Sequence, residues 1–477
     1  MAFLIGGANS AADDAYEVAN SCRFNNDDSD HMHKTPGSAG NRRTWTVSVW
    51  VKKSLVGGST RKAIFGTADT EVNGDGGCLL RFENGDALKF ESDGGQVTVV
   101  ETNALYRDPS AWMHVVLAVD TTQGTAANRV KIYINGVQET SLATSTYPAQ
   151  NKDYHWNNTV VNYVGAYDDS GDIAVPFDGY MAEFVSIDGS ALTPSSFGEY
   201  NEDSPTIWQP IDVSGLTFGT NGFYLDFEDS ANLGNDANGG TDLTEVNLAA
   251  TNQATDSPTN NFCTLNPLDN NNATNLPTLF EGNLDVLSVS DSTWSITPGT
   301  IALPKSGKWY YEVEAVTGRA GDRSAMAGWA NPEADNPLSN GSMFSRNSNG
   351  NIMQDDSSIA TGYTTWHADG DILGCYIDMD NSKLYWAMNG TIQASGTGIS
   401  FAGGFDDADF IIPMVQVINL EKLSVNFGNP ATNFAIASGN ADANGYGNFE
   451  FDPSSGTFDG ASKDFYAICT KNLAEFG

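Results

Sequence analysis

Apolar and polar residues alternate with a period of two along many short runs of this chain, and the spacing of an amphipathic helix is hard to find. The clearest run is 44–53, TWTVSVWVKK, which predicts a β-strand. Two more runs meet at Asn84-Gly85 within 78–91, and run 130–134 ends in another Asn-Gly pair. Such pairs adopt the positive φ angles that tight hairpins require. The pattern therefore predicts an all-β protein built from antiparallel hairpins.

The grouping of these runs predicts two antiparallel β-sandwich (jelly-roll) domains joined by a connector rich in Gly, Asn and Asp. We expect the first sandwich in 1–205. The connector, 206–262, contains one short β hairpin around 222–229. The second sandwich and a C-terminal tail fill 263–477.

Composition narrows the function. The chain has 477 residues, with 60 Asp and Glu against 23 Lys and Arg, so its formal net charge is −37. Such a charge repels phosphates and disfavours binding to nucleic acid or to anionic membrane surfaces. The sequence contains no apolar run long enough to span a membrane, and its start, MAFLIGGANS, lacks the basic residues of a signal peptide. We therefore expect no membrane insertion.

The charge is distributed unevenly. No Lys or Arg occurs between Lys152 and Lys305. One explanation is a surface adapted to high salt, where self-repulsion is screened; the other is a surface that binds divalent cations. The five cysteines are widely spaced and contain no CxxC pair, which predicts buried thiols rather than a disulfide framework or a zinc site.

Four motifs occur in order in the first block. They are WTVSVWV at 45–51, WMHVVLAVD at 112–120, KIYING at 131–136 and FDGYMAE at 177–183. This order resembles the concanavalin A-like jelly roll of laminin G-like and pentraxin domains. In that resemblance, His114 lies within a core strand.

The second block carries the motif GDILGCYIDMD at 370–380, preceded by GKWYYEV at 307–313 and followed by Asn389-Gly390. These motifs resemble those of a SPRY domain, and the resemblance covers about 282–428. Two domains of binding type in tandem are thus implied.

Catalytic patterns are missing from the sequence. Glu91-Ser-Asp93 begins the carboxylate pattern of the concanavalin-like glucanases, but the third carboxylate does not follow. Neither a nucleophile elbow nor a nucleotide-binding loop occurs. The sequence therefore predicts a protein that is not an enzyme.

Two aromatic groups are candidates for ligand binding, because the C–H faces of sugar rings stack on Trp and Tyr. One is Tyr154, His155 and Trp156; the other is Tyr363 and Trp366. The alternative for both groups is half-buried packing within a sandwich.

Two clusters are candidates for metal binding. Asp168, Asp169 and Asp172 surround a glycine, which suits Ca²⁺, and laminin G-like and pentraxin-like domains include members that bind Ca²⁺ in rim loops. His31 and His33 form an H-x-H pattern, so they either share one face of a strand and chelate a metal or belong to a solvated turn. The chain is thus expected to have no cofactor or to bind Ca²⁺.

A further resemblance concerns the two ends. Residues 21–54 and 464–477 resemble segments of laminin G-like virion proteins of marine bacteriophages. The resemblance implies a virion protein made in the host cytoplasm, which binds other virion proteins and a host cell-surface glycan or receptor and forms a homo-oligomer. The first hypothesis is a tail fibre or tail-associated adhesin. The alternatives are a capsid decoration or head-fibre protein and, more remotely, a hydrolase of envelope glycans.

Overall fold

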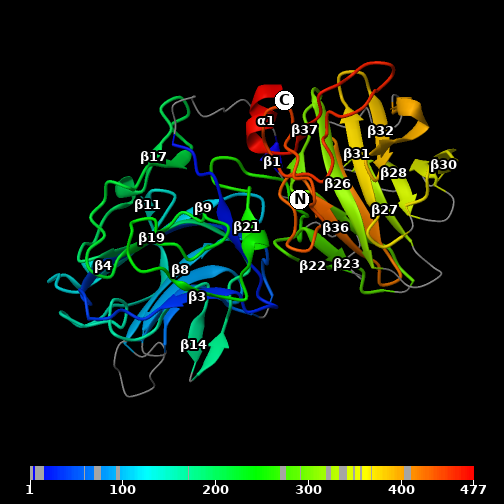
Figure 1. Ribbon diagram of the computed structural model, residues 1–477. Helices are drawn as coiled ribbons and strands as arrows, with labels where there is room; N and C mark the ends of the chain where they lie inside the picture. The colour runs from blue at the N-terminus through cyan, green and yellow to red at the C-terminus, as the bar shows by residue number, and fades with distance from the viewer. Residues whose placement is uncertain are drawn as a thin grey trace. The chain divides into compact units, whose positions relative to one another are not determined.

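The computed structural model describes residues 4–5, 16–58, 60–68, 77–92, 97–169, 171–268, 276–290, 292–317, 324–331, 341–346, 350–354, 357–366, 368–401 and 410–476. Contacts divide the chain into two compact units. The N-terminal unit is Ala11–Thr259, and the C-terminal unit combines Met1–Ser10 with Asn260–Gly477. Strands dominate both units (Figure 1), so the prediction of an all-β fold with two sandwiches is confirmed.

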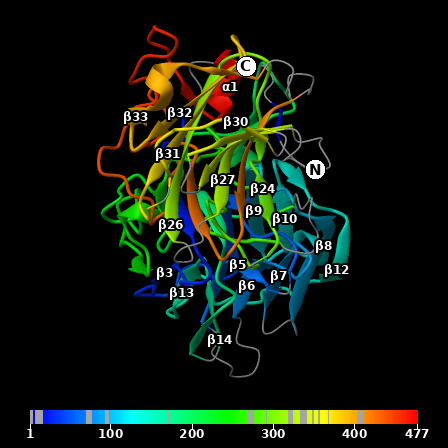
Figure 2. The ribbon, with the colours of Figure 1, turned by 90° about the vertical axis from the view of Figure 1, so that its right-hand side faces the viewer.

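Two sheets build the N-terminal unit. The β4 sheet has the strand order β11 (Val137–Gln138), β10 (Val130–Ile134), β9 (Met113–Asp120), β4 (Thr44–Lys53), β16 (Gly179–Asp188), β2 (Ser21–Phe24) and β21 (Gln253–Ala254), and β19 (Phe223–Leu225) also pairs with β16. The β6 sheet (Figure 2) has the order β12 (Leu142–Thr146), β8 (Thr98–Leu105), β7 (Ala87–Ser92), β6 (Cys78–Phe82), β5 (Lys62–Thr67), β13 (Asn162–Val164), β3 (His31–Lys34) and β20 (Thr244–Val246).

Shorter elements connect these strands. Two hairpins pair β14 (Tyr167–Asp169) with β15 (Asp172–Ala174) and β17 (Gly198–Tyr200) with β18 (Trp208–Pro210). Single turns of 3-10 helix lie at Ala126–Asn128, Pro194–Ser196 and Ala250–Asn252.

Alternation along β4 explains how the N-terminal core forms. Trp45, Val47 and Val49 join a hydrophobic cluster with residues from both sheets. Ser48 and Lys52 point to the other side of the β4 sheet, yet they are buried as well. The outward face of this sheet is therefore covered, and its polar side chains need partners within the protein.

The cover comes largely from the segment that was expected to be a connector. Up to Thr259 it belongs to the N-terminal unit, and β19, β20 and β21 extend the two sheets. Phe223 and Leu225 enter the core, and the Asp256 carboxylate lies 2.6 Å from Lys52 Nζ. The segment thus completes the first sandwich. Its strands are too short for alternation to reveal them, which is why the pattern suggested a connector.

The C-terminal unit repeats this plan with two other sheets. The β26 sheet has the order β22 (Thr278–Phe280), β23 (Asp285–Leu287), β36 (Lys422–Asn426), β26 (Lys308–Thr317), β31 (Ile372–Asp378), β32 (Lys383–Met388) and β33 (Thr391–Ile392), with β34 (Ile399–Ser400) on β32 and β37 (Tyr466–Ala467) on β26. The β27 sheet has the order β24 (Ser295–Pro298), β35 (Ile412–Val417), β27 (Ala325–Ala330), β28 (Gly341–Arg346), β29 (Ile352–Gln354) and β30 (Ser357–Ala360). The remaining elements are β1 (Leu4–Ile5), which pairs with β25 (Ile301–Ala302), a 3-10 turn at Gln393–Gly396, and the helix α1 (Thr470–Phe476).

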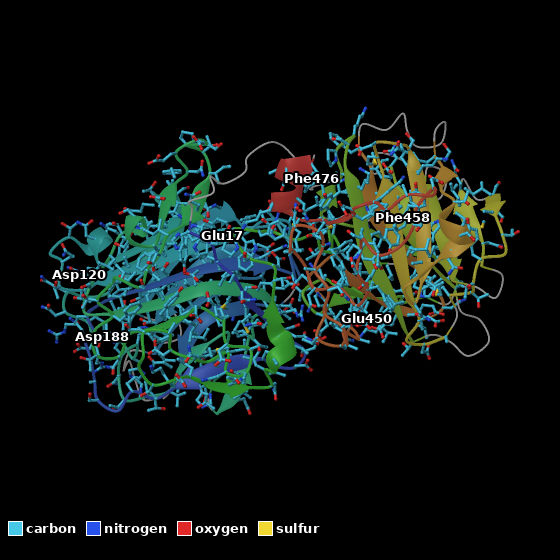
Figure 3. All side chains as sticks on the ribbon, turned by 45° about the horizontal axis from the view of Figure 1, so that its top comes forward. Glu17, Asp120, Asp188, Glu450, Phe458 and Phe476 are labelled. Atoms are coloured by element: carbon cyan, nitrogen blue, oxygen red, sulfur yellow. The ribbon has the colours of Figure 1, made fainter. Side chains whose placement is uncertain are left out.

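A tail covers the outward face of the β26 sheet. Phe458, labelled in Figure 3, lies 5.2 Å from the ring centre of Tyr376 and 5.1 Å from that of Tyr385. Phe449 packs on Tyr310 at 5.1 Å. Burial of these aromatic rings holds the tail to the sheet. In the described part of the chain, no helix has the length and hydrophobicity needed to cross a membrane.

Candidate functional site

His114 lies on the outward face of β9, in the middle of an aromatic stack. Its ring centre is 4.8 Å from that of Trp50 and 6.0 Å from that of Trp208, with interplanar angles of 20° in both pairs. Nδ1 of His114 accepts a hydrogen bond from Trp208 Nε1 at 2.9 Å, and Nε2 lies 2.7 Å from Ser48 Oγ. Because an indole nitrogen only donates, the proton of the neutral imidazole is on Nε2.

His114 orients the side chains that it contacts. Burial lowers the pKa of His114 to about 3, so the imidazole is neutral near pH 7. Both of its nitrogens are occupied within the stack. The histidine therefore holds Trp208 in place instead of transferring protons.

Two glycines make room for the indole of Trp208. A Cβ atom on Gly136 would lie 2.6 Å from its Cε3 atom, and one on Gly198 would lie 2.7 Å from its Cε2 atom. Tyr200 packs edge-on against the indole, with ring centres 5.0 Å apart. The β17–β18 hairpin is thereby held against the turn that joins β10 and β11.

Three large apolar side chains on the two hairpins that meet at Trp208 are exposed, and we call them the Tyr200 patch. Tyr200 is 45% exposed, Val137 is 58% exposed and Ile207 is 37% exposed. Gln209 Nε2 donates to Glu199 Oε1 at 3.4 Å, and alternation places this pair on the other face of the hairpin from Tyr200 and Trp208. An exposed aromatic ring of this kind can stack on the C–H face of a sugar ring.

The outward face of the β6 sheet carries basic and acidic side chains that pair with one another. Arg81 forms ion pairs with Glu83, at 2.7 Å, and with Glu91. Lys89 lies 2.9 Å from Glu91 and 3.2 Å from Glu83. Burial raises the pKa of Glu83, but the adjacent Arg81 and Lys89 outweigh it and leave that pKa below its ordinary value. These four side chains stabilise one another, and each already has an oppositely charged partner within the protein.

Two histidines lie farther along the same face. His31 and His33 flank Met32, whose side chain is in the core, so both point outward from β3. Tyr163 on β13 lies beside them, with its ring centre 5.8 Å from each. The H-x-H pattern therefore belongs to a strand, as one of the two sequence interpretations required. Burial lowers the pKa of His33, and His31 lowers it further.

Each unit also buries a glutamate whose pKa is raised to about 7, mainly by burial. Glu183 lies where the pairing of β16 with β4 shifts register, and Tyr224 donates to it at 2.8 Å. Glu312 accepts hydrogen bonds from the backbone N–H groups of Glu450 and Phe451, at 3.0 and 2.9 Å. Since hydrogen bonds from the protein engage both carboxylates, their role in this structure is to hold covering segments on the sheets.

The aromatic residues predicted to bind a ligand are mostly core residues. Tyr154 is 0%, Trp156 1% and Trp366 0% exposed, and His155 is 4% exposed. Tyr363 packs against the core while half-buried. A buried ring cannot stack on a sugar, so the packing alternative is correct for the first four. They are attractive in the sequence because turns surround them, and only the packing shows where they point.

The aspartates predicted to bind calcium do not converge. Asp168 Oδ1 accepts a hydrogen bond from the Gly171 N–H at 2.6 Å, and its Oδ2 accepts one from Tyr163 Oη at 3.2 Å. Asp169 and Asp172 are register partners at the end of the β14–β15 hairpin. Among the residues described, no three His, Cys, Asp or Glu side chains are grouped to hold a metal. In this structure the aspartates shape a turn, and their binding of Ca²⁺ stays a prediction.

Sequence reasoning missed the Tyr200 patch. Its only signal is the run EYNEDSPTIWQP at 199–210, in which a turn-rich stretch separates Tyr200 from Trp208. That pattern predicts a hairpin, but it does not indicate which aromatic side chain is buried and which is exposed.

Comparison with known families supports both domain predictions. Residues 26–196 match the model of the concanavalin A-like lectin/glucanases superfamily in its laminin G form, and residues 308–430 match the SPRY domain model.

Solved structures that are similar to this chain include laminin G and SPRY domains. Mouse laminin alpha1 chain domains LG4-5 share 13% identity over 88% of this chain and 92% of that chain, with a TM-score of 0.31. The SPRY domain of human HERC1 shares 16% identity over 34% of this chain and 96% of that chain, with a TM-score of 0.28. The CBM40 of the Ruminococcus gnavus IT-sialidase, bound to alpha2,3 sialyllactose, shares 16% identity over 31% of this chain and 87% of that chain, with a TM-score of 0.23. By its two family-model matches, this chain carries a laminin G-like, concanavalin A-like domain and a SPRY domain in tandem.

Proposed function

We propose that this protein is a bacteriophage virion protein, a tail fibre or tail-associated adhesin that binds a glycan or protein on the host surface without covalent chemistry. The observation that carries the proposal is the Tyr200 patch, an exposed aromatic and aliphatic surface on a domain of binding type. The resemblance of 21–54 and 464–477 to marine phage virion proteins supports the particle as its location.

The patch is suited to binding because its base is rigid. Trp208 is held by the hydrogen bond to His114 and by the two glycines beneath it, so the edge of Tyr200 rests on a fixed support. A preorganised surface loses little conformational entropy when a ligand binds. One ring and a few polar groups give weak affinity per site, and several copies of the chain on one particle would convert weak binding into stable attachment.

Binding of the purified chain to a glycan array and to host cells tests the proposal. We expect Tyr200→Ala to weaken binding about tenfold or more and Tyr200→Phe to retain most of it, because stacking requires the ring rather than the hydroxyl group. Leu105→Ala is the matched control, since Leu105 is exposed to a similar extent, 49%, on β8. Equal binding by Tyr200→Ala and the parent chain would exclude the patch.

Antibody labelling of intact particles tests the location. Label at the tail agrees with an adhesin, whereas label distributed over the head identifies a capsid decoration protein and contradicts the tail assignment. Release of reducing ends from a host polysaccharide would contradict the proposal that binding occurs without catalysis.

A further inference from the structure

The histidine pair on β3 forms a compact cluster that glycan or receptor binding does not use. His31 and His33 have ring centres 6.0 Å apart, and the ring of Tyr163 lies 5.8 Å from each of them. The three rings thus form a nearly equilateral triangle on the outward face of the β6 sheet. His31 is only 5% exposed.

The hydrogen bonds leave coordinating nitrogens free. Nδ1 of His31 lies 2.8 Å from the carbonyl oxygen of Ser29, so this nitrogen donates and Nε2 keeps its lone pair. A bond from the other ring nitrogen to a carbonyl is the usual way in which a metal-binding histidine is oriented. Nδ1 of His33 is buried and has no hydrogen-bond partner within the described structure. A buried polar atom of this kind calls for a partner that the protein itself does not supply.

The spacing of the two imidazoles suits one shared metal ion. A transition metal about 2.0–2.1 Å from a ring nitrogen lies about 3.2 Å from the centre of that ring. Two imidazoles can therefore share a metal when their centres are less than about 6.4 Å apart. The observed separation of 6.0 Å is below this limit.

We infer that His31 and His33 bind one divalent transition-metal ion, Cu²⁺, Ni²⁺ or Zn²⁺, with water in the remaining positions. Imidazole nitrogen favours these ions over Ca²⁺ and Mg²⁺, and Cu²⁺ binds most tightly. The described residues offer no group of three His, Cys, Asp or Glu ligands, so the site has two side-chain ligands. Tyr163, whose hydroxyl group bonds to Asp168, borders the third side of the triangle.

Metal titration of the full chain without a histidine tag tests the inference. We expect one Cu²⁺ per chain in calorimetry, weaker binding of Ni²⁺ and Zn²⁺, and none of Mg²⁺. Electron paramagnetic resonance of the Cu²⁺ form should show coupling to two nitrogens. His31→Gln and His33→Gln should each weaken binding at least tenfold, while His367→Gln, at a histidine far from this pair in the sequence, should bind like the parent chain.

Several results would overturn the inference. They are the absence of Cu²⁺ binding at millimolar metal, a spectrum with fewer than two nitrogens, or affinity unchanged in both His31→Gln and His33→Gln. Circular dichroism of each variant shows whether it folds, and the spectrum of the parent chain decides the question if one does not. Tyr163→Phe should retain the metal, since the phenol is not among the proposed ligands. Glycan binding is measured separately, so either proposal can fail alone.

Discussion

The buried ion pair between Lys52 and Asp256 provides a direct test of whether 206–259 belongs to the first sandwich. Lys52 Nζ and Asp256 Oδ2 are 2.6 Å apart, and the side chains are 1% and 0% exposed. Trp112 Nε1 donates to the other carboxylate oxygen at 2.8 Å. Lys52→Met keeps the length and apolar part of the side chain while it removes the ammonium group that balances the carboxylate.

The expected loss is large because the carboxylate stays buried. Removal of one partner of a buried ion pair destabilises a protein by about 3–5 kcal/mol. For a unit of this size, each kcal/mol lowers the melting temperature by about 2–4 °C. We therefore expect the transition of the N-terminal unit to fall by roughly 6–20 °C. Lys52→Met combined with Asp256→Leu should recover much of this loss, since the buried charge is then absent.

Differential scanning calorimetry measures the transition, and hydrogen exchange with mass spectrometry assigns it to β4 and the segment around Asp256. Arg43→Met is the matched control, because Arg43 and Asp153 form a pair at 2.8 Å whose side chains are 45% and 41% exposed. The control should have a much smaller effect. If Lys52→Met is no more harmful than Arg43→Met, Asp256 does not pack on β4 and the segment is a connector after all.

Three more predictions concern other buried groups. The pKa of Glu312 is raised to about 7 from 4.5, so its contribution to stability is full below pH 4.5 and is lost as pH rises through about 7; Glu312→Gln should flatten this decline in the melting temperature of the C-terminal unit. The pKa of His114 is lowered to about 3 from 6.5, so its contribution is full above pH 6.5 and is lost as pH falls towards 3; His114→Gln should flatten the acid side of the stability profile of the N-terminal unit. Phe458→Ala removes a buried ring and should destabilise the C-terminal unit by about 3–5 kcal/mol in urea unfolding, with faster proteolysis of the tail; an unchanged midpoint and cleavage rate would show that the tail does not pack on the sheet.

The long strands could be predicted because each carries its own alternation. Run 44–53 coincides with β4, and run 130–134 coincides with β10. Asn135 and Gly136 adopt φ angles of 46° and 81° in the turn, as an Asn-Gly pair should. The SPRY motif at 370–380 likewise contains β31. In each case the information is local, since neighbouring residues define both the strand and its turn.

The candidate sites could not be predicted in the same way, because exposure depends on what covers each face. Trp156 and Tyr200 both lie near turns, but Trp156 enters the core and Tyr200 remains 45% exposed. The spacing of His31 and His33 left open whether they share one face of a strand or belong to a solvated turn, and the pairing of β3 with β13 decided for the strand. The position of Tyr163 beside them depends on strand pairing, and so does the lack of a hydrogen-bond partner for His33 Nδ1 among the described residues.

By itself, the sequence determined the all-β class and the strands whose alternation exceeds about five residues, because a strand with one face in a core must alternate. The two domain types came from motifs that resemble those of known families. The tertiary structure alone decided which outward faces are covered. The alternating pattern predicts that polar residues of the two central strands face solvent. Two of them, Ser48 on β4 and Glu312 on β26, are instead buried beneath segments that follow much later in the chain. The physical reason is that burial is a property of the whole fold: a segment of short strands or a tail adds little periodic signal, yet it removes an entire face of a sheet from water.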